Sequence, residues 1–223
     1  MIRRSTLRAQ IAAALRDEIL AGRLPTGRDF TVKEIAEQYG VSATPVREAL
    51  VDLAAQGLLD VEQHRGFRVH EFTMDDFRAM IEVRSLLMEG VFRRVTPGNG
   101  LVHAPDPAAL ASVRRRADAS AGAALAGDLD VLIGYDLRYW RELGEVIRNA
   151  YVRDFLDRVR VQSWAFAVPY LRRAESLAGE LWSGHRELVD AVERRDVRTA
   201  ERIVAGYNDH ALSLVGKLAS GPE

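Results

Sequence analysis

The hydrophobic and polar positions divide the chain into two unequal parts. In residues 5–21, apolar side chains recur every three to four positions, which predicts an amphipathic helix. Shorter helical patterns cover Val32–Gln38 and Ala43–Gln56. Short apolar stretches at Leu58–Val61 and Phe67–His70 predict two strands around a tight turn.

From about residue 73 onward the pattern is helical throughout. The predicted helices cover residues 74–95, 107–126, 129–147, 149–171, 176–194 and 197–218. Because no long alternating strand occurs, the pattern disfavours a sheet-based enzyme. The sequence therefore predicts a mainly α protein with two domains: residues 1–71, with a small β-wing, and residues 72–223, an all-α antiparallel helical bundle.

Composition narrows the classes of protein. The 223 residues include 48% hydrophobic and 28% charged side chains, which is typical of a globular chain. The absence of cysteine excludes disulfide frameworks, cysteine-ligated metal sites and cysteine nucleophiles. Neither a signal-peptide pattern nor an apolar run of about 20 residues occurs, so we expect a cytoplasmic protein without a membrane contact. The net charge of −1 does not by itself favour nucleic acid, so a DNA-binding function has to rest on local patterning.

Residues 31–56 have the pattern helix, tight turn, helix. Thr31 and Glu34 form a predicted capping box, and Ser42 is a predicted N-cap of the second helix. This arrangement is a helix-turn-helix, in which the second helix enters the major groove with its N-terminus first. Arg47, about one turn into that helix, is placed to contact a phosphate or a guanine edge.

The motifs of this region resemble a known domain. The segments GRLPTG at 22–27, IAEQYGVSATPVREAL at 35–50 and LAAQGL at 53–58 resemble the winged-helix domain of the GntR family of bacterial transcription regulators. Ala43 stands where that family commonly has an arginine, which removes one phosphate or base contact. The resemblance implies the following DNA-facing residues: Lys33, Ser42, Thr44, Pro45, Arg47, His64, Arg65 and Gly66.

The second domain resembles the FCD effector-binding domain of the FadR subfamily. Three segments carry the resemblance: EVR at 82–84, DLRYWREL at 136–143 with Asn149, and HRELVDAV at 185–192. Many members of that subfamily hold a divalent metal with one Asp and three His. Here Asp136 and His185 remain, while Trp140 and Tyr207 occupy the other two ligand positions.

Because two of the four ligand positions are replaced, we assign no metal or other cofactor on the strength of the resemblance. If a metal binds, we expect Asp136, His185 and His210 to hold it. The interpretation that we favour is an effector pocket in the bundle, since an interior arginine suits a carboxylate. Its expected lining is Arg84, Asp136, Asn149, His185 and Tyr207.

Taken together, the sequence predicts a non-enzymatic, ligand-responsive regulator that acts as a homodimer on palindromic double-stranded operator DNA. Repression is the commoner outcome in the family that it resembles, and an organic acid is the expected effector. Two alternatives stay open. One is a DNA-binding regulator without a small-molecule effector; the other is a metal-dependent helical hydrolase that uses Asp136, His185 and His210.

Overall fold

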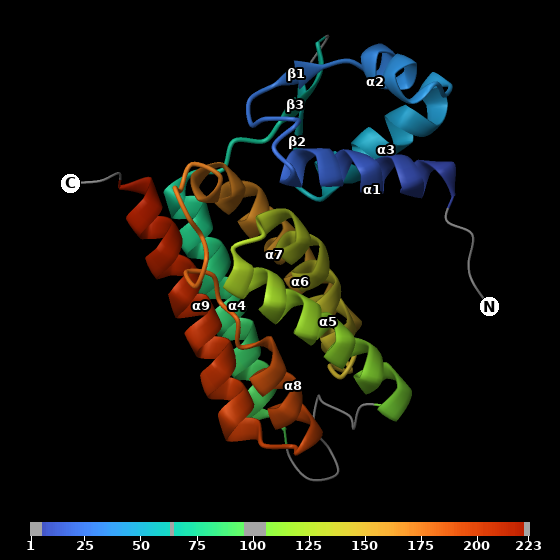
Figure 1. Ribbon diagram of the computed structural model, residues 1–223. Helices are drawn as coiled ribbons and strands as arrows, with labels where there is room; N and C mark the ends of the chain where they lie inside the picture. The colour runs from blue at the N-terminus through green and yellow to red at the C-terminus, as the bar shows by residue number, and fades with distance from the viewer. Residues whose placement is uncertain (1–5, 63–64, 96–105, 221–223) are drawn as a thin grey trace. The chain divides into compact units, whose positions relative to one another are not determined.

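The computed structural model describes residues 6–62, 65–95 and 106–220 (Figure 1). The chain divides into two compact units, one ending at Thr73 and the other beginning at Met74. The predicted fold class is confirmed: a winged helix-turn-helix with a small sheet in the first unit, and helices only in the described parts of the second. None of the helices in the described ranges is long and apolar enough to cross a membrane.

The first unit combines three helices with a three-stranded antiparallel sheet. Its elements are α1 (Leu7–Leu20), β1 (Asp29–Phe30), α2 (Val32–Tyr39), α3 (Ala43–Ala55), β2 (Leu59–Glu62) and β3 (Gly66–Val69). The strand order is β1-β3-β2. β1 was not predicted, because two residues are too short to show an alternating pattern. It pairs Asp29 with Arg68 and Phe30 with Phe67.

Local sequence signals explain how the two motif helices begin and end. Thr31 and Glu34 form the predicted capping box, with each side chain bonded to the other residue's backbone N–H. α2 ends at Gly40, which has a left-handed φ of 64°. The prediction for Ser42 is only half right: it is the N-cap residue of α3, but its side chain makes no capping hydrogen bond. Behind the motif, Val46 and Leu50 of α3 are fully buried.

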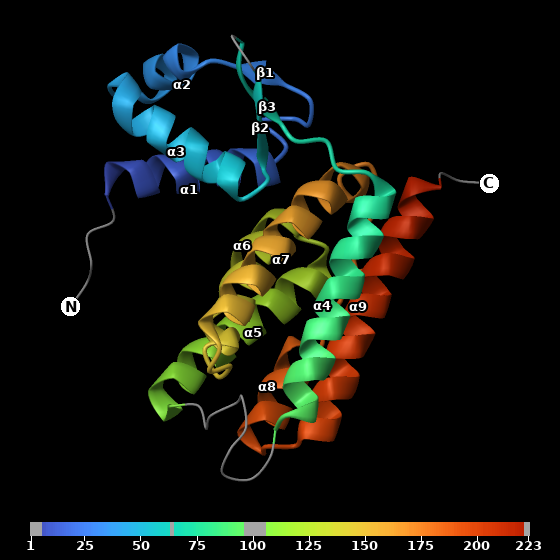
Figure 2. The same cartoon turned by 180° about the vertical axis from the view of Figure 1, so that it is seen from behind.

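The second unit is a helical bundle. Its elements are α4 (Met74–Arg93), α5 (Pro107–Ala126), α6 (Leu129–Gly144), α7 (Ala150–Leu171), α8 (His185–Glu193) and α9 (Val197–Ala219). α4 and α9 lie antiparallel and side by side in both views (Figures 1 and 2), and α5 packs against α6. α8 fits between α5 and α9. The core includes Tyr139, Leu188 and Val189, all at most 1% exposed.

The predicted helix over 176–194 is wrong in its first half, because only His185–Glu193 is helical. Leu177 and Leu181 are both buried and four residues apart, so their spacing imitates a helix. Gly179, however, has a left-handed φ of 76°, which a helix does not contain. Residues 172–184, called the wall segment below, therefore connect α7 to α8 without regular structure.

Candidate functional site

The N-terminus of α3 presents an exposed polar surface. Ser42, Thr44 and Arg47 are all exposed, and Pro45 is half-buried in the first turn. Because Ser42 makes no capping bond, its hydroxyl is not committed to the helix. Hydroxyls and backbone N–H groups at a helix N-terminus favour phosphate oxygens. This surface therefore has the donors that the sequence predicted there.

The α2 side of this surface supplies a second cation. A shallow groove between the helices is lined by Lys33 and Arg47 together with Val32, Ala36, Glu37, Gly40, Val41 and Ala43. The Lys33 ammonium lies 3.8 Å from Glu37 and its side chain is 85% exposed. An ion pair this long and this exposed contributes little stability, so Lys33 is free to exchange Glu37 for a phosphate.

The backbone of the β-wing requires glycine at one of the predicted positions, Gly66. Gly66 has a φ of 110°, and a Cβ there would lie 2.5 Å from the carbonyl oxygen of Phe30. Glycine at this position thus permits β1 to pair with β3. Arg65 beside it is exposed, and His64 lies outside the described residues.

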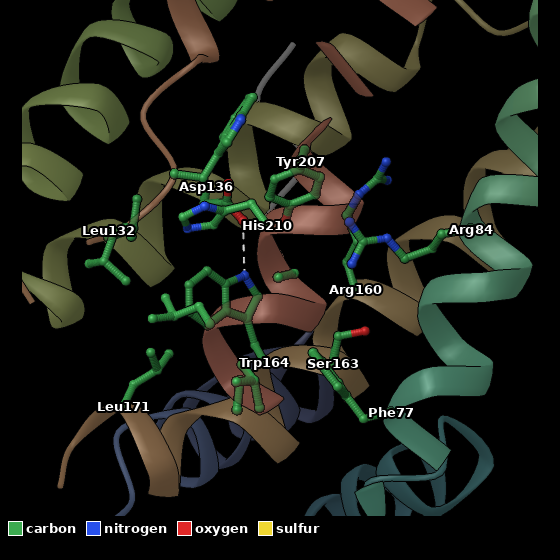
Figure 3. A pocket seen from close by; sticks show the side chains of 16 residues that line it. Phe77, Arg84, Leu132, Asp136, Arg160, Ser163, Trp164, Leu171, Tyr207 and His210 are labelled. Atoms are coloured by element: carbon green, nitrogen blue, oxygen red, sulfur yellow. Dashed lines mark hydrogen bonds between the residues drawn. The ribbon is translucent and has the colours of Figure 1, made fainter. Parts of the chain in front are cut away.

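The second unit contains a cavity of about 70 Å³ between α4, α6, α7, α9 and the wall segment (Figure 3). Its lining is largely apolar. The lining residues that carry polar groups are Arg84, Asp136, Arg160, Ser163, Trp164, Trp182, Tyr207 and His210. In Figure 3, Arg84 reaches inward from α4 towards Arg160.

Asp136 is the centre of a buried hydrogen-bond network. Its side chain lies almost wholly inside the bundle, at 1% exposure. Trp164 donates its indole N–H to Oδ2 at 2.9 Å. Trp140 donates its indole N–H to Oδ1 at 3.0 Å, and His185 Nε2 lies 3.0 Å from the same oxygen. Because indole N–H groups only donate, the network holds Asp136 as an acceptor on both oxygens.

Two arginines are buried around the same cavity. Arg84 donates to the side-chain oxygen of Asn208 at 2.7 Å and lies 4.7 Å from the centre of the Tyr207 ring. Arg160 lies 4.4 Å from the centre of the Trp140 ring. Burial, with a smaller contribution from nearby Arg84, lowers the pKa of Arg160 to about 10. The Arg160 guanidinium therefore remains cationic at neutral pH.

The structure brings together some of the predicted effector residues and separates others. Arg84, Asp136 and Tyr207 line the cavity, and burial raises the pKa of Tyr207. His185 stands behind Asp136, where it also accepts the Tyr139 hydroxyl on its backbone oxygen at 3.0 Å. Asn149 lies elsewhere, because its side chain caps α7 by accepting the backbone N–H of Val152.

Sequence reasoning missed several residues that line the cavity. These are Arg160, Ser163, Trp164 and Trp182, together with apolar neighbours. A signal for three of them was present: positions 160, 163 and 164 share one face of a helix with 167 and 171, all of which line the cavity. No comparable signal marked Trp182, because it lies in the irregular wall segment.

The residues at the expected metal position do not fit a metal ion. Two of the four ligand positions are Trp140 and Tyr207, and the oxygens of Asp136 accept two indole N–H groups. An indole N–H is a donor only, so neither tryptophan can ligate. Within the described ranges, no three His, Asp or Glu side chains are placed to hold a metal ion. The expected set of Asp136, His185 and His210 is therefore not arranged as a metal site.

A winged helix-turn-helix joined to a helical bundle defines a class of DNA-binding regulators. Comparison with known families agrees with this class. Residues 7–69 match the family described as "Bacterial regulatory proteins, gntR family". Residues 79–209 match the FCD domain. The chain belongs to the GntR family of transcription regulators, and its FCD domain is consistent with the FadR-type subfamily. It is a regulator and not an enzyme.

Individual relatives support the same assignment. The chain is 30% identical, over 92% of its length and 86% of the relative's, to a Paenarthrobacter nicotinovorans protein named "Probable D-xylose utilization operon transcriptional repressor". It is 33% identical over 38% of its length, and 37% of the relative's, to the Escherichia coli HTH-type transcriptional repressor RspR.

Solved structures share the fold. The structure of Escherichia coli McbR/YncC covers 96% of this chain, and 99% of its own chain is covered, with a TM-score of 0.71 and 21% identity. A GntR regulator from Rhodococcus sp. RHA1 covers 98% of this chain, with 100% of its own chain covered, a TM-score of 0.69 and 18% identity.

Proposed function

We propose that this regulator is a cytoplasmic repressor, that it binds a palindromic operator as a homodimer, and that a small carboxylate in the buried cavity alters its affinity for DNA. The observation that carries the proposal is the pairing of an exposed α3 N-terminus in one unit with an arginine-lined cavity in the other. Such a chain has one surface for DNA and one interior site for a ligand.

The proposed DNA contacts divide into two kinds. Arg47 reads a base edge, because it is exposed about one turn into α3. Lys33, Ser42 and Thr44 bind backbone phosphates, and Pro45 shapes the first turn of the helix. In the wing, His64, Arg65 and Gly66 lie at the minor groove. Phosphate contacts of this number make the affinity fall steeply with salt.

Dimerisation and repression rest on separate arguments. A two-fold protein presents two recognition helices to the two halves of a palindrome, which favours a homodimer. Two relatives are named as transcriptional repressors, which favours repression here. Neither argument depends on the ligand.

Helix α4 connects the proposed ligand site to the DNA-binding unit along the chain. α4 begins at Met74, directly after the DNA-binding unit, and carries the cavity residues Phe77 and Arg84. A ligand that binds differently to two positions of α4 shifts the balance between them. Because the same helix continues the chain from the winged helix, such a shift reaches the DNA-binding unit.

The DNA-binding part is tested with an operator selected from random duplexes with the full-length protein. Arg47→Ala should lower affinity for that operator by about tenfold or more, since a base-reading arginine contributes roughly 1–3 kcal/mol. The matched control is Arg93→Ala, an exposed arginine of α4. Equal affinity of Arg47→Ala and the wild type would contradict the recognition-helix assignment.

The effector part is tested by repeating the operator titration with a panel of small carboxylates and their uncharged amides. At least one acid should change the apparent operator affinity where its amide does not. If operator binding is specific but indifferent to every acid and amide, the chain is a regulator without a small-molecule effector.

A further inference from the structure

Arg160 on α7 is a buried cation that forms no ion pair within the described residues, although the carboxylates of Asp157 and Asp136 lie near enough to favour its charge. Its side chain is 6% exposed. Within the described parts of the chain its guanidinium takes part in no hydrogen bond or ion pair, and its Nε is buried without a partner. Its close neighbour is the face of the Trp140 ring at 4.4 Å, which attracts a cation but cannot neutralise it. Buried cations are ordinarily paired, so this arrangement is incomplete.

The other charged groups that line the cavity do not neutralise Arg160. Arg84 is a second cation, and its partner Asn208 is neutral. The lining contains one carboxylate, Asp136, whose two oxygens already face two indole N–H groups and His185. Two cations against one carboxylate leave the cavity with an excess positive charge.

Buried polar atoms without hydrogen-bond partners line the same cavity. Besides Arg160, the Nε of Arg84 and the Nε2 of His210 are buried without a hydrogen-bond partner in the described chain, and both residues line the cavity. Buried polar atoms without partners are uncommon in native proteins. Two of the three are arginine N–H groups, which only donate, so they indicate a missing group that accepts hydrogen bonds.

The rest of the wall limits the body of that group. Phe77, Leu132, Leu171, Leu181 and Leu214 line the cavity with apolar surface. The cavity volume of about 70 Å³ limits the group to a small molecule. The complement of such a site is a small molecule with one acidic group and a short apolar body.

From this arrangement we propose that Arg160 is the principal anion-binding side chain of the cavity, and that with Arg84 it holds the carboxylate of a small monocarboxylic acid without a metal ion. The proposal deepens the effector site proposed above and rests on it. Asp136 does not bind this ligand: its bonds to Trp140 and Trp164 fix the wall on which the ligand packs.

The first experiment needs no ligand. Arg160→Met replaces the uncompensated cation with an apolar side chain of similar length. Its thermal midpoint without ligand should rise by roughly 4 °C, since apolar replacement of a buried charge is often stabilising. The transition is followed by tryptophan fluorescence, because all three tryptophans lie in the helical unit.

The matched control for stability is Arg116→Met. Arg116 is half-buried rather than buried, and it pairs with Glu142 at 2.6 Å, so its loss should lower the midpoint or leave it unchanged. If Arg160→Met lowers the midpoint as Arg116→Met does, Arg160 is compensated inside the folded chain and the proposal is overturned.

The second experiment uses acetate, butyrate and their amides as probes. Butyrate should raise the midpoint of the wild type and change its tryptophan fluorescence, whereas butyramide should do neither. Arg160→Met should need at least tenfold more butyrate than the wild type for the same rise in midpoint. Arg160→Lys should retain part of the wild-type response. The proposal is overturned if acid and amide act alike, if neither acid acts, or if Arg160→Met responds as the wild type does.

Operator affinity in the same samples separates this proposal from the proposed function. Butyrate that binds through Arg160 but leaves operator affinity unchanged would support the anion site and contradict the effector role of the cavity. A carboxylate that changes operator affinity equally in the wild type and in Arg160→Met would support the effector function and overturn the role of Arg160.

Discussion

The hydrogen bond from Trp164 to Asp136 should make Trp164→Phe much more damaging than an ordinary loss of an indole ring. Trp164 is the donor to Oδ2 of Asp136, and Oδ1 is bonded by Trp140 and His185. Phenylalanine would leave Oδ2 buried without that donor. A hydrogen bond to a charged group contributes about 1.5–3 kcal/mol, and an unpaired buried charge costs at least as much.

Trp182→Phe is the control for the loss of ring area. Trp182 is half-buried like Trp164 and lines the same cavity, but in the described structure its indole N–H forms no hydrogen bond. Trp182→Phe keeps an aromatic ring against Trp140, His185 and Tyr207 and loses no hydrogen bond, so the excess damage in Trp164→Phe reports mainly the bond to Asp136. We expect Trp164→Phe to be less stable than Trp182→Phe by about 2 kcal/mol.

The assay is thermal unfolding followed by the fluorescence of the two remaining tryptophans, which reports on the helical unit alone. At roughly 2–4 °C per kcal/mol for a chain of this size, the midpoints should differ by about 4–8 °C. Midpoints within about 1 °C of each other, which is roughly 0.25–0.5 kcal/mol and so within the error of such comparisons, would refute the importance of the Trp164 bond.

Three further predictions concern the wing, the motif helices and the metal position. Gly66→Ala should destabilise the first unit by roughly 1–3 kcal/mol, because the new Cβ meets the Phe30 carbonyl oxygen at a φ that alanine rarely adopts; hydrogen exchange of the β3 amides measures it, and unchanged protection would contradict the reasoning. Thr31→Ala should cost the same unit about 1 kcal/mol while Thr31→Ser costs little, as chemical unfolding by far-ultraviolet circular dichroism would show. Elemental analysis of purified, untagged protein should find far less than one zinc, nickel or manganese ion per chain, since tryptophan donors occupy Asp136; a stoichiometric ion would contradict this.

The sequence predicted most of the helices because their signals are local. The capping box at Thr31 and Glu34 and the left-handed Gly40 fix both ends of α2 within a few residues. The strand at Asp29–Phe30 escaped prediction because it exists only through pairing with β3. The wall segment was misread because Leu177 and Leu181 have helical spacing although the backbone between them does not.

The cavity was harder to predict than the fold for a physical reason. Arg84 and Asp136 were found because they lie in motif segments with a known resemblance. Arg160 and Trp164 lie in a helix outside the motif segments, and only the packing of α7 against its neighbours, among them α6 and α9, turns them inward. The spacing of residues on one helix shows which share a face, but not which neighbour that face meets.

The irregular wall segment also has an evolutionary consequence. It contributes Leu181 and Trp182 to the cavity, while its backbone is not tied to the repeat of a helix. Irregular segments accept insertions and substitutions more readily than the elements they connect. Substitutions and insertions in residues 172–184 can therefore change the size and shape of the cavity in related chains, while the charged residues on α4 and α7 stay as they are.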